Sequence, residues 1–256
     1  MKVFHKLRFA APVTFLLAIS LPAPVMSQYT ISTGTAMDLS FGAGQYLLGQ
    51  IVLKDAARMS QKKSGSSSPK SSTNTTSKVA PSPKPESVKL TDTRFSRRGG
   101  HNVALNGIVA TYPAGQQAEA RQLFDQLLNT YPSVMRQLGQ SENDLAVGMA
   151  AYIAANYSGY NNVPFPDEKF APLVEQMRES MQADPQIAAL TPEKKQKLND
   201  TMAAIAMQAA VMQNRLQQNP DPAMESQLRQ FSEKNLRDGL GINARDIKIT
   251  EHGMIL

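Results

Sequence analysis

The chain has 256 residues and a formal net charge of +6, from 27 Lys and Arg against 21 Asp and Glu. It contains no cysteine, which excludes disulfides, thiol nucleophiles and thiolate metal sites, and no tryptophan, which argues against a carbohydrate-binding module. The basic excess lies in residues 54–98, whereas residues 99–256 carry more acids than bases. The overall basicity is therefore not evidence for a nucleic-acid-binding fold, and we expect no nucleic-acid partner.

The first 27 residues have the pattern of a secretory signal peptide. Lys2, Lys6 and Arg8 form a positive start, and an apolar run follows over residues 9–21. The short segment after the apolar run ends at Ser27, and we expect signal peptidase to cleave after this residue. An uncleaved membrane anchor is the alternative, but the apolar run is shorter than the roughly 20 residues that span a bilayer. The pattern predicts an exported protein, either periplasmic or secreted.

Residues 28–59 form a short segment in which glycine and apolar residues are mixed. Leu47, Leu48, Ile51 and Val52 recur at a spacing that suits one face of a helix. Nearby glycines weaken such a helix. The segment could dock on a membrane surface or pack loosely on the main domain, and the sequence leaves both readings open.

Residues 60–93 are rich in Ser, Thr, Lys and Pro. A segment of this composition cannot bury enough apolar surface to offset the entropy of ordering it, so we predict a disordered, extended linker. Its lysines could make weak contacts with an anionic surface such as lipid headgroups or cell-wall polymers, or they could serve only to keep the linker solvated.

The hydrophobic periodicity after about residue 115 predicts five amphipathic helices. The first should end near Tyr131-Pro132, and residues 247–250 alternate like a short strand or extended tail. The residues expected to cap the later helices are Ser141, Asp144, Asp167, Thr191 and Asp221. Residues 94–256 are thus predicted to form an all-α domain, a compact antiparallel bundle with a short C-terminal tail.

Several runs in this domain resemble a bacterial family of exported helical proteins of unknown function. The residues that carry the resemblance are 142–146 (ENDLA), 150–157 (AAYIAANY), Gln176, Gln196 and 246–253 (DIKITEHG). The resemblance covers about residues 94–256. It implies an exported helical domain preceded by a variable segment, and it implies no particular activity.

Histidine chemistry has little support in the sequence. After removal of the signal peptide two histidines remain, His101 in an entry segment that we expect to be flexible and His252 in the tail. A two-histidine metal site would require these two ends to converge. The sequence also lacks the H-E-x-x-H, G-x-S-x-G and phosphate-loop patterns, so we expect no metal and no cofactor.

A hydrolase that uses paired carboxylates is harder to exclude, because a glycosidase needs only two acids at a set distance. The available acids are Glu142, Asp144, Asp167, Glu168, Glu175 and Glu179. Asp144 and Asp167 are already explained as helix caps, and Glu175 and Glu179 are expected on a solvated face.

The best candidate site is polar rather than catalytic. Asn156 lies on the same predicted helix face as Tyr152 and Tyr160, and Gln176 is expected to face it from the next helix. Buried amides need partners, so this cluster either ties helices together or lines a ligand groove. The sequence favours a non-catalytic interaction module that binds an unknown envelope protein or polymer. The alternative is a cell-envelope hydrolase.

Overall fold

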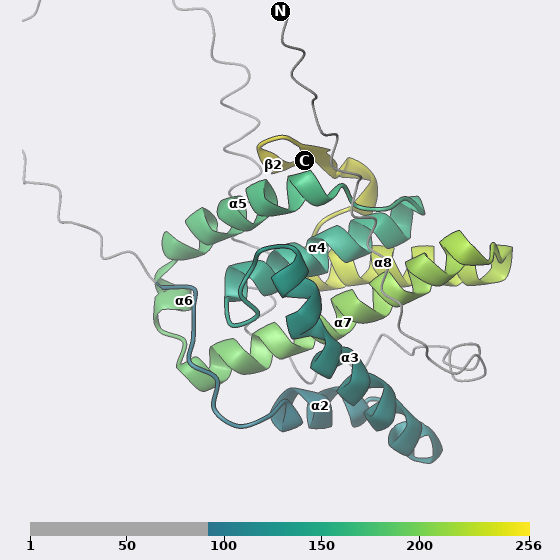
Figure 1. Cartoon of the computed structure of the whole chain (residues 1–256), viewed down its shortest axis with the longest axis horizontal. Helices are drawn as coiled ribbons and strands as arrows, with labels where there is room; N and C mark the ends of the chain where they lie inside the picture. Colours follow the sequence, from purple (N-terminus) through teal and green to yellow (C-terminus); the bar gives the residue numbers. More distant parts are fainter. Residues whose placement is uncertain (1–91) are drawn as a thin grey trace, which may run out of the picture.

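The computed structural model describes residues 92–256 (Figure 1). The predicted signal peptide, the glycine-containing apolar segment and almost all of the predicted linker lie outside the described residues. The helices of the described part are α2 (Asn102–Val109), α3 (Gln117–Gln137), α4 (Leu145–Asn161), α5 (Phe170–Gln182), α6 (Pro185–Ala188), α7 (Pro192–Gln218) and α8 (Pro222–Leu240). The predicted all-α bundle is confirmed, and α2 and α6 are additional to the five expected helices.

Helix α4 is the centre of the bundle, with α5, α7 and α8 packed around it. Its residues are mostly alanine, glycine and aliphatic, and nearly all are buried, as expected for a helix that is apolar on every side. Small residues allow close approach of the neighbours. A Cβ added at Gly148 would lie 2.3 Å from Asn199 Oδ1 of α7, and one at Gly159 would lie 2.3 Å from Ser232 Oγ of α8.

Helix α3 does not end near Tyr131, as the sequence predicts, but continues through Pro132 to Gln137. Proline removes one backbone hydrogen bond and usually breaks a helix. Here the apolar stripe continues beyond it, because Val134 and Met135 are as deeply buried as Tyr131. Core packing on both sides of the proline therefore outweighs the lost bond.

Residues 92–101, which we call the N-terminal strap, are held against the bundle. The Leu145 amide donates to Thr93 O and the Phe95 amide to Asn143 O, both at 3.0 Å. The expectation of a flexible entry segment around Arg97 is wrong for this stretch. Periodicity could not reveal the contact, because an extended strap carries no helical pattern and its partners lie far along the chain.

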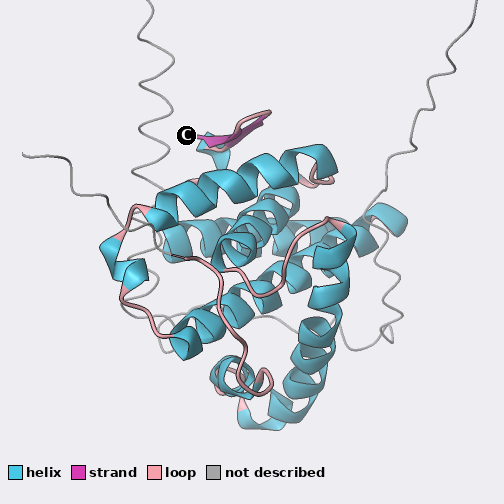
Figure 2. Ribbon diagram, turned by 60° about the vertical axis from the view of Figure 1, so that its left-hand side comes forward, coloured by secondary structure: helices cyan, strands magenta, loops and turns pink. Residues whose placement is uncertain are grey.

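The C-terminal tail forms an antiparallel hairpin of β1 (Lys248–Thr250) and β2 (Gly253–Ile255), reached through the 3-10 helix η4 (Ala244–Asp246). Lys248 pairs with Ile255 and Thr250 with Gly253. The hairpin lies on α5, at the upper edge of the molecule in Figures 1 and 2. Other 3-10 helices are η2 (Ala114–Gln116) and η3 (Asp167–Lys169).

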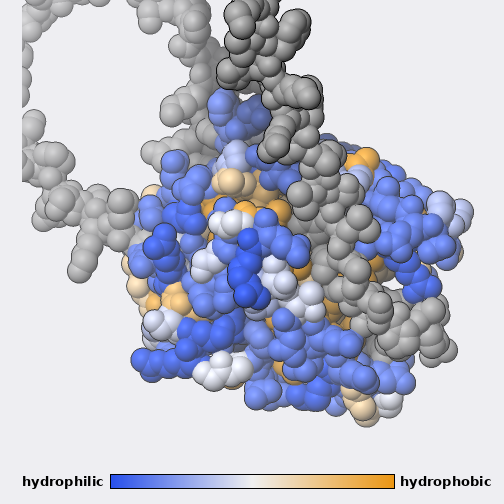
Figure 3. Space-filling model, in the orientation of Figure 1, coloured by the Kyte–Doolittle hydropathy of each residue, from blue (hydrophilic) through white to orange (hydrophobic). Residues whose placement is uncertain are grey.

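The surface of the described part is largely polar. Figure 3 shows a mostly hydrophilic face with small hydrophobic patches between the charged side chains. Within residues 92–256, no helix has the length and hydropathy needed to cross a membrane.

Candidate functional site

An apolar groove of about 280 Å³ lies between α3, α4, α7 and the loop that leads into α5. Met135 of α3 and the adjoining Leu138, Ala151 and Ala155 of α4, and Met207 of α7 contribute to its walls. The alanines of α4 have short side chains, so they leave space where larger residues would fill the gap between helices. This volume is just below the roughly 300–1,000 Å³ that is usual for ligand pockets.

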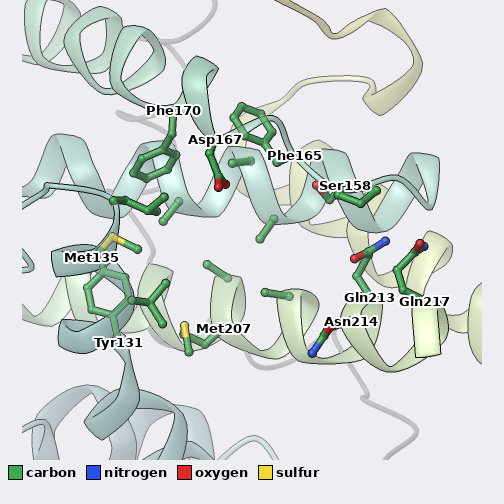
Figure 4. A pocket seen from close by; sticks show the side chains of 18 of the residues that line it. Tyr131, Met135, Ser158, Phe165, Asp167, Phe170, Met207, Gln213, Asn214 and Gln217 are labelled. Carbon is green, nitrogen blue, oxygen red and sulfur yellow. The ribbon is translucent and has the colours of Figure 1, made fainter. Parts of the chain in front are cut away.

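One end of this groove is polar. Figure 4 shows Ser158, Gln213 and Gln217 together at that end, and Tyr131, Met135 and Met207 at the other. Ser158 Oγ and Gln213 Nε2 are buried, and neither has a hydrogen-bond partner among the described residues. Buried polar atoms are normally satisfied, because an unmade hydrogen bond costs about 1–3 kcal/mol. These two atoms are therefore available to a bound group.

Asp167 is the one acid that lines the groove among the described residues, and no basic side chain lines it. Burial, and then the charge of Glu168, raises the pKa of the Asp167 carboxyl above its ordinary value. A raised pKa means that its contribution to stability is largest at low pH and is lost as pH rises through the folded-state pKa. The groove thus suits a neutral group better than an anion.

The prediction that Asp167 caps the third helix is wrong. Asp167 lies in η3, which begins after Pro166, and its side chain makes no capping bond. Helix α5 starts three residues later, at Phe170, and its N-terminal neighbour Lys169 makes no side-chain cap either. Pro166 itself has an extended backbone, with φ of −67° and ψ of 119°. The 3-10 turn therefore begins after Pro166, and α5 begins only at Phe170.

The structure places other predicted caps at helix starts. Asp144 accepts from the Ala146 amide at 3.0 Å, Thr191 occupies the N-cap of α7, and Asp221 that of α8. Ser141 is not part of a capping box on α4, because Asp144 itself is the N-cap. The Ser141 hydroxyl instead accepts from the Asn143 amide.

Two members of the predicted polar cluster lie together and connect α4 to α8. Asn156 Nδ2 donates to Tyr152 O at 2.8 Å, and the Tyr152 hydroxyl donates to Asn235 O at 2.7 Å. Asn235 Nδ2 then donates to Asn156 Oδ1 at 2.8 Å. All three side chains are buried. This closed set of bonds ties two helices together, and it leaves no amide of the set free for a ligand.

The other two predicted members lie elsewhere. Gln176 does not face Asn156, because it is turned toward the C-terminal hairpin: its Nε2 donates to Met254 O at 2.8 Å and its Oε1 accepts from the Met254 amide at 2.6 Å. Tyr160 is half-buried and carries the Arg229 guanidinium 4.6 Å above its ring. Helical spacing identifies one face, but it does not tell which neighbouring element that face meets.

A charged cluster that the sequence reading missed fixes the N-terminal strap to α7. Arg97 binds both oxygens of Asp200, at 2.9 and 2.8 Å, and His101 Nδ1 lies 3.3 Å from the same carboxylate. Burial opposes ionisation of Asp200, but the hydrogen bonds from His101 and Arg97 outweigh it, so the pKa of Asp200 is lowered from its ordinary 3.8. Its stabilising effect is therefore present above pH 3.8 and is lost as pH falls through the folded-state pKa.

The acids proposed for hydrolysis do not gather at the groove. Asp144 pairs with Arg178 at 2.8 Å, and Arg178 also pairs with Glu175. Glu142, Glu168 and Glu179 do not line the groove. His101 belongs to the Arg97 cluster and His252 to the exposed turn of the hairpin, and residues 92–256 hold no group of three metal-ligating side chains.

The chain belongs to a family of unknown function (DUF6683), whose model matches residues 9–256. Membership in a family of unknown function agrees with the resemblance noted from the sequence, and the matched region is longer than the 94–256 expected, because it also includes the segments before the helical domain. Comparison with curated proteins and with solved structures gives no match.

Proposed function

We propose that this member of the family is an exported, non-catalytic binding module of the bacterial cell envelope, and that the groove between α3, α4 and α7 holds a neutral, apolar part of a partner. The observation that carries the proposal is the pairing of apolar walls with two buried, unpartnered polar atoms, Ser158 Oγ and Gln213 Nε2. Apolar walls give affinity through burial, and the polar end gives orientation.

Export is supported by the sequence of the first 27 residues, and the basic linker supports a weak additional contact with anionic lipid or cell-wall polymer. Mass spectrometry of the protein recovered from the envelope fraction tests the first point. A mature N-terminus at Gln28 is expected, and an intact Met1 would contradict export by cleavage.

Groove binding is tested with the neutral apolar dye Nile red, which needs no knowledge of the natural partner. Ala155→Phe places an aromatic ring in the groove wall and should weaken dye binding about tenfold or more. Ala118→Phe is the matched control, because Ala118 is exposed on α3 and does not line the groove. Equal dye binding by both variants and the unmodified chain would refute the groove as a binding site.

The hydrolase alternative keeps one specific observation in its favour, the raised pKa of Asp167 in the groove. Carboxylate catalysis of glycoside cleavage needs a second acid facing the first, and the described lining residues contribute none. Incubation of the chain and of Asp167→Asn with purified peptidoglycan separates the two proposals. Release of soluble sugars by the unmodified chain alone would favour the hydrolase.

A further inference from the structure

We propose that the groove is occupied, in the mature protein, by the chain's own apolar segment, residues 39–53, and that an external partner binds by displacing it. The inference rests on the proposed function, because it assigns the first occupant of the same groove. Three features of the molecule support this choice: the chemistry of the segment, the length and charge of the chain that tethers it, and the extent of the family match.

The chemistry of the segment matches that of the groove. Residues 39–53 contain no charged side chain, and Leu47, Leu48, Ile51 and Val52 lie at helical spacing. The groove walls are largely apolar and include no basic residue, so an uncharged apolar occupant suits the groove better than an anion does. The small volume suits two or three aliphatic side chains of a peptide rather than a complete lipid.

The polar end of the groove also suits a peptide. Gln213 offers a free Nε2 donor, and main-chain carbonyls are the acceptors that a peptide always carries. The same fold already contains such a contact, since Gln176 binds both the carbonyl and the amide of Met254 through its side-chain amide. A glycine-containing segment brings its backbone close to a neighbouring side chain without steric hindrance.

The tether allows the contact and favours it. About 40 residues separate the segment from Asp92, and most of them belong to the predicted linker; a random coil of this length would span roughly 35 Å root-mean-square, comparable to the diameter of the domain. Such a tether would give an effective concentration near the millimolar range. Residues 54–91 carry eight bases against two acids, and residues 99–256 carry thirteen bases against seventeen acids, so the net charges of the tether and of this part of the domain are opposite in sign. The family model matches the segment and the domain together, over residues 9–256.

The absence of cysteine from the chain makes a direct test possible. Gln50→Cys with Ala210→Cys places one thiol in the segment and one in the groove wall, and leaves all four aliphatic residues intact. The matched control is Ala80→Cys with Ala210→Cys. Residue 80 is closer to the domain along the chain, so a free tether predicts that the control pair forms its intramolecular disulfide at least as fast.

Docking predicts the opposite order. The pair at residues 50 and 210 should oxidise about tenfold faster than the control pair, and Leu48→Asn with Ile51→Asn in the same background should remove the difference. Equal rates in the two pairs, or a disulfide that forms only between two copies of the chain, would overturn the proposal.

Nile red titration separates a failure here from a failure of the proposed function. If the segment occupies the groove, Leu48→Asn with Ile51→Asn should strengthen dye binding several-fold, and Ala155→Phe should cancel that gain. Dye binding that depends on Ala155 but not on the segment would overturn self-occupancy and leave the binding groove in place.

Discussion

At the scale of single residues, Asn156 shows how a buried amide holds two helices. Its side chain accepts from Asn235 and donates to Tyr152 O, so replacing it strands the Asn235 amide inside the core. We expect Asn156→Leu to lower the free energy of unfolding by about 1–3 kcal/mol in urea denaturation. The double variant Asn156→Leu with Asn235→Leu should lose less free energy of unfolding than the two single variants together. In each single variant one buried amide loses its partner, whereas in the double variant both amides are gone.

The chain offers a matched control for this experiment. Asn161 also lies on α4 and makes the same bond to the carbonyl four residues earlier, at 2.9 Å, but it is exposed. Asn161→Leu should therefore change stability by no more than about 0.5 kcal/mol. Equal losses in Asn156→Leu and Asn161→Leu would show that the bond between helices contributes nothing.

The sequence predicted that Asn156 faces inward, but it did not predict its partner on α8. Helical periodicity specifies the face on which Asn156 lies, but which neighbouring face meets it, here the one that carries Asn235, depends on how the helices are arranged in space. The cluster around Asp200 was even harder to predict from the sequence. Asp200 sits within a long amphipathic helix, where an acid is ordinarily solvated, and its partner Arg97 lies about a hundred residues away in an extended strap.

At the scale of elements, the C-terminal hairpin is attached to α5 through Gln176. Gln176→Glu keeps an acceptor for the Met254 amide but replaces the donor to Met254 O by a second oxygen. A buried carbonyl without its donor costs about 1–3 kcal/mol, so hydrogen exchange at the Met254 amide should accelerate about tenfold or more. Gln182→Glu, at a half-buried position that ends the same helix, is the control and should leave that amide protected.

A second feature of the hairpin makes this test specific. Gly253 has a φ of +108°, and a Cβ there would lie 2.3 Å from Gln176 Oε1. The turn is therefore shaped to bring the main chain against the Gln176 amide. Unchanged exchange at Met254 in Gln176→Glu would mean that the hairpin is held by its own strand pairing and by apolar contacts alone.

The elements were predicted well where one local signal decides them and poorly where packing decides. The starts of α7 and α8 follow from a capping residue and a proline in sequence, and both were expected. The sequence prediction ended α3 at Pro132, whereas the helix continues to Gln137. The packing of Val134 and Met135 that stabilises this extension depends on the assembled core, so it cannot be read from the local sequence. The groove was missed for the same reason: its walls come from three helices whose sequences show only ordinary apolar faces.

At the scale of the whole molecule, the described bundle and the chain before it should differ in resistance to protease. The composition of residues 60–91 predicts rapid cleavage by trypsin at its lysines. The resistant product should retain Arg97 and extend to the C-terminal hairpin, rather than begin near residue 115 as hydrophobic periodicity alone suggests. The N-terminal strap is bonded to Asn143 and Leu145 and closed by the Arg97–Asp200 pair, so trypsin cannot reach it without local opening.

The contribution of the Arg97–Asp200 ion pair to holding the N-terminal strap can be measured by replacing Asp200. Asp200 is almost fully buried, and Asp200→Asn leaves Arg97 without its anionic partner, which costs about 3 kcal/mol and raises the opened population about a hundredfold. Trypsin should then cut after Arg97 or Arg98, and mass spectrometry should detect the shorter fragment. Glu193→Gln is the control, because the Arg98–Glu193 pair is exposed and contributes little. If the unmodified chain is cut after Arg97 as fast as Asp200→Asn, the strap opens freely and the pair does not hold it.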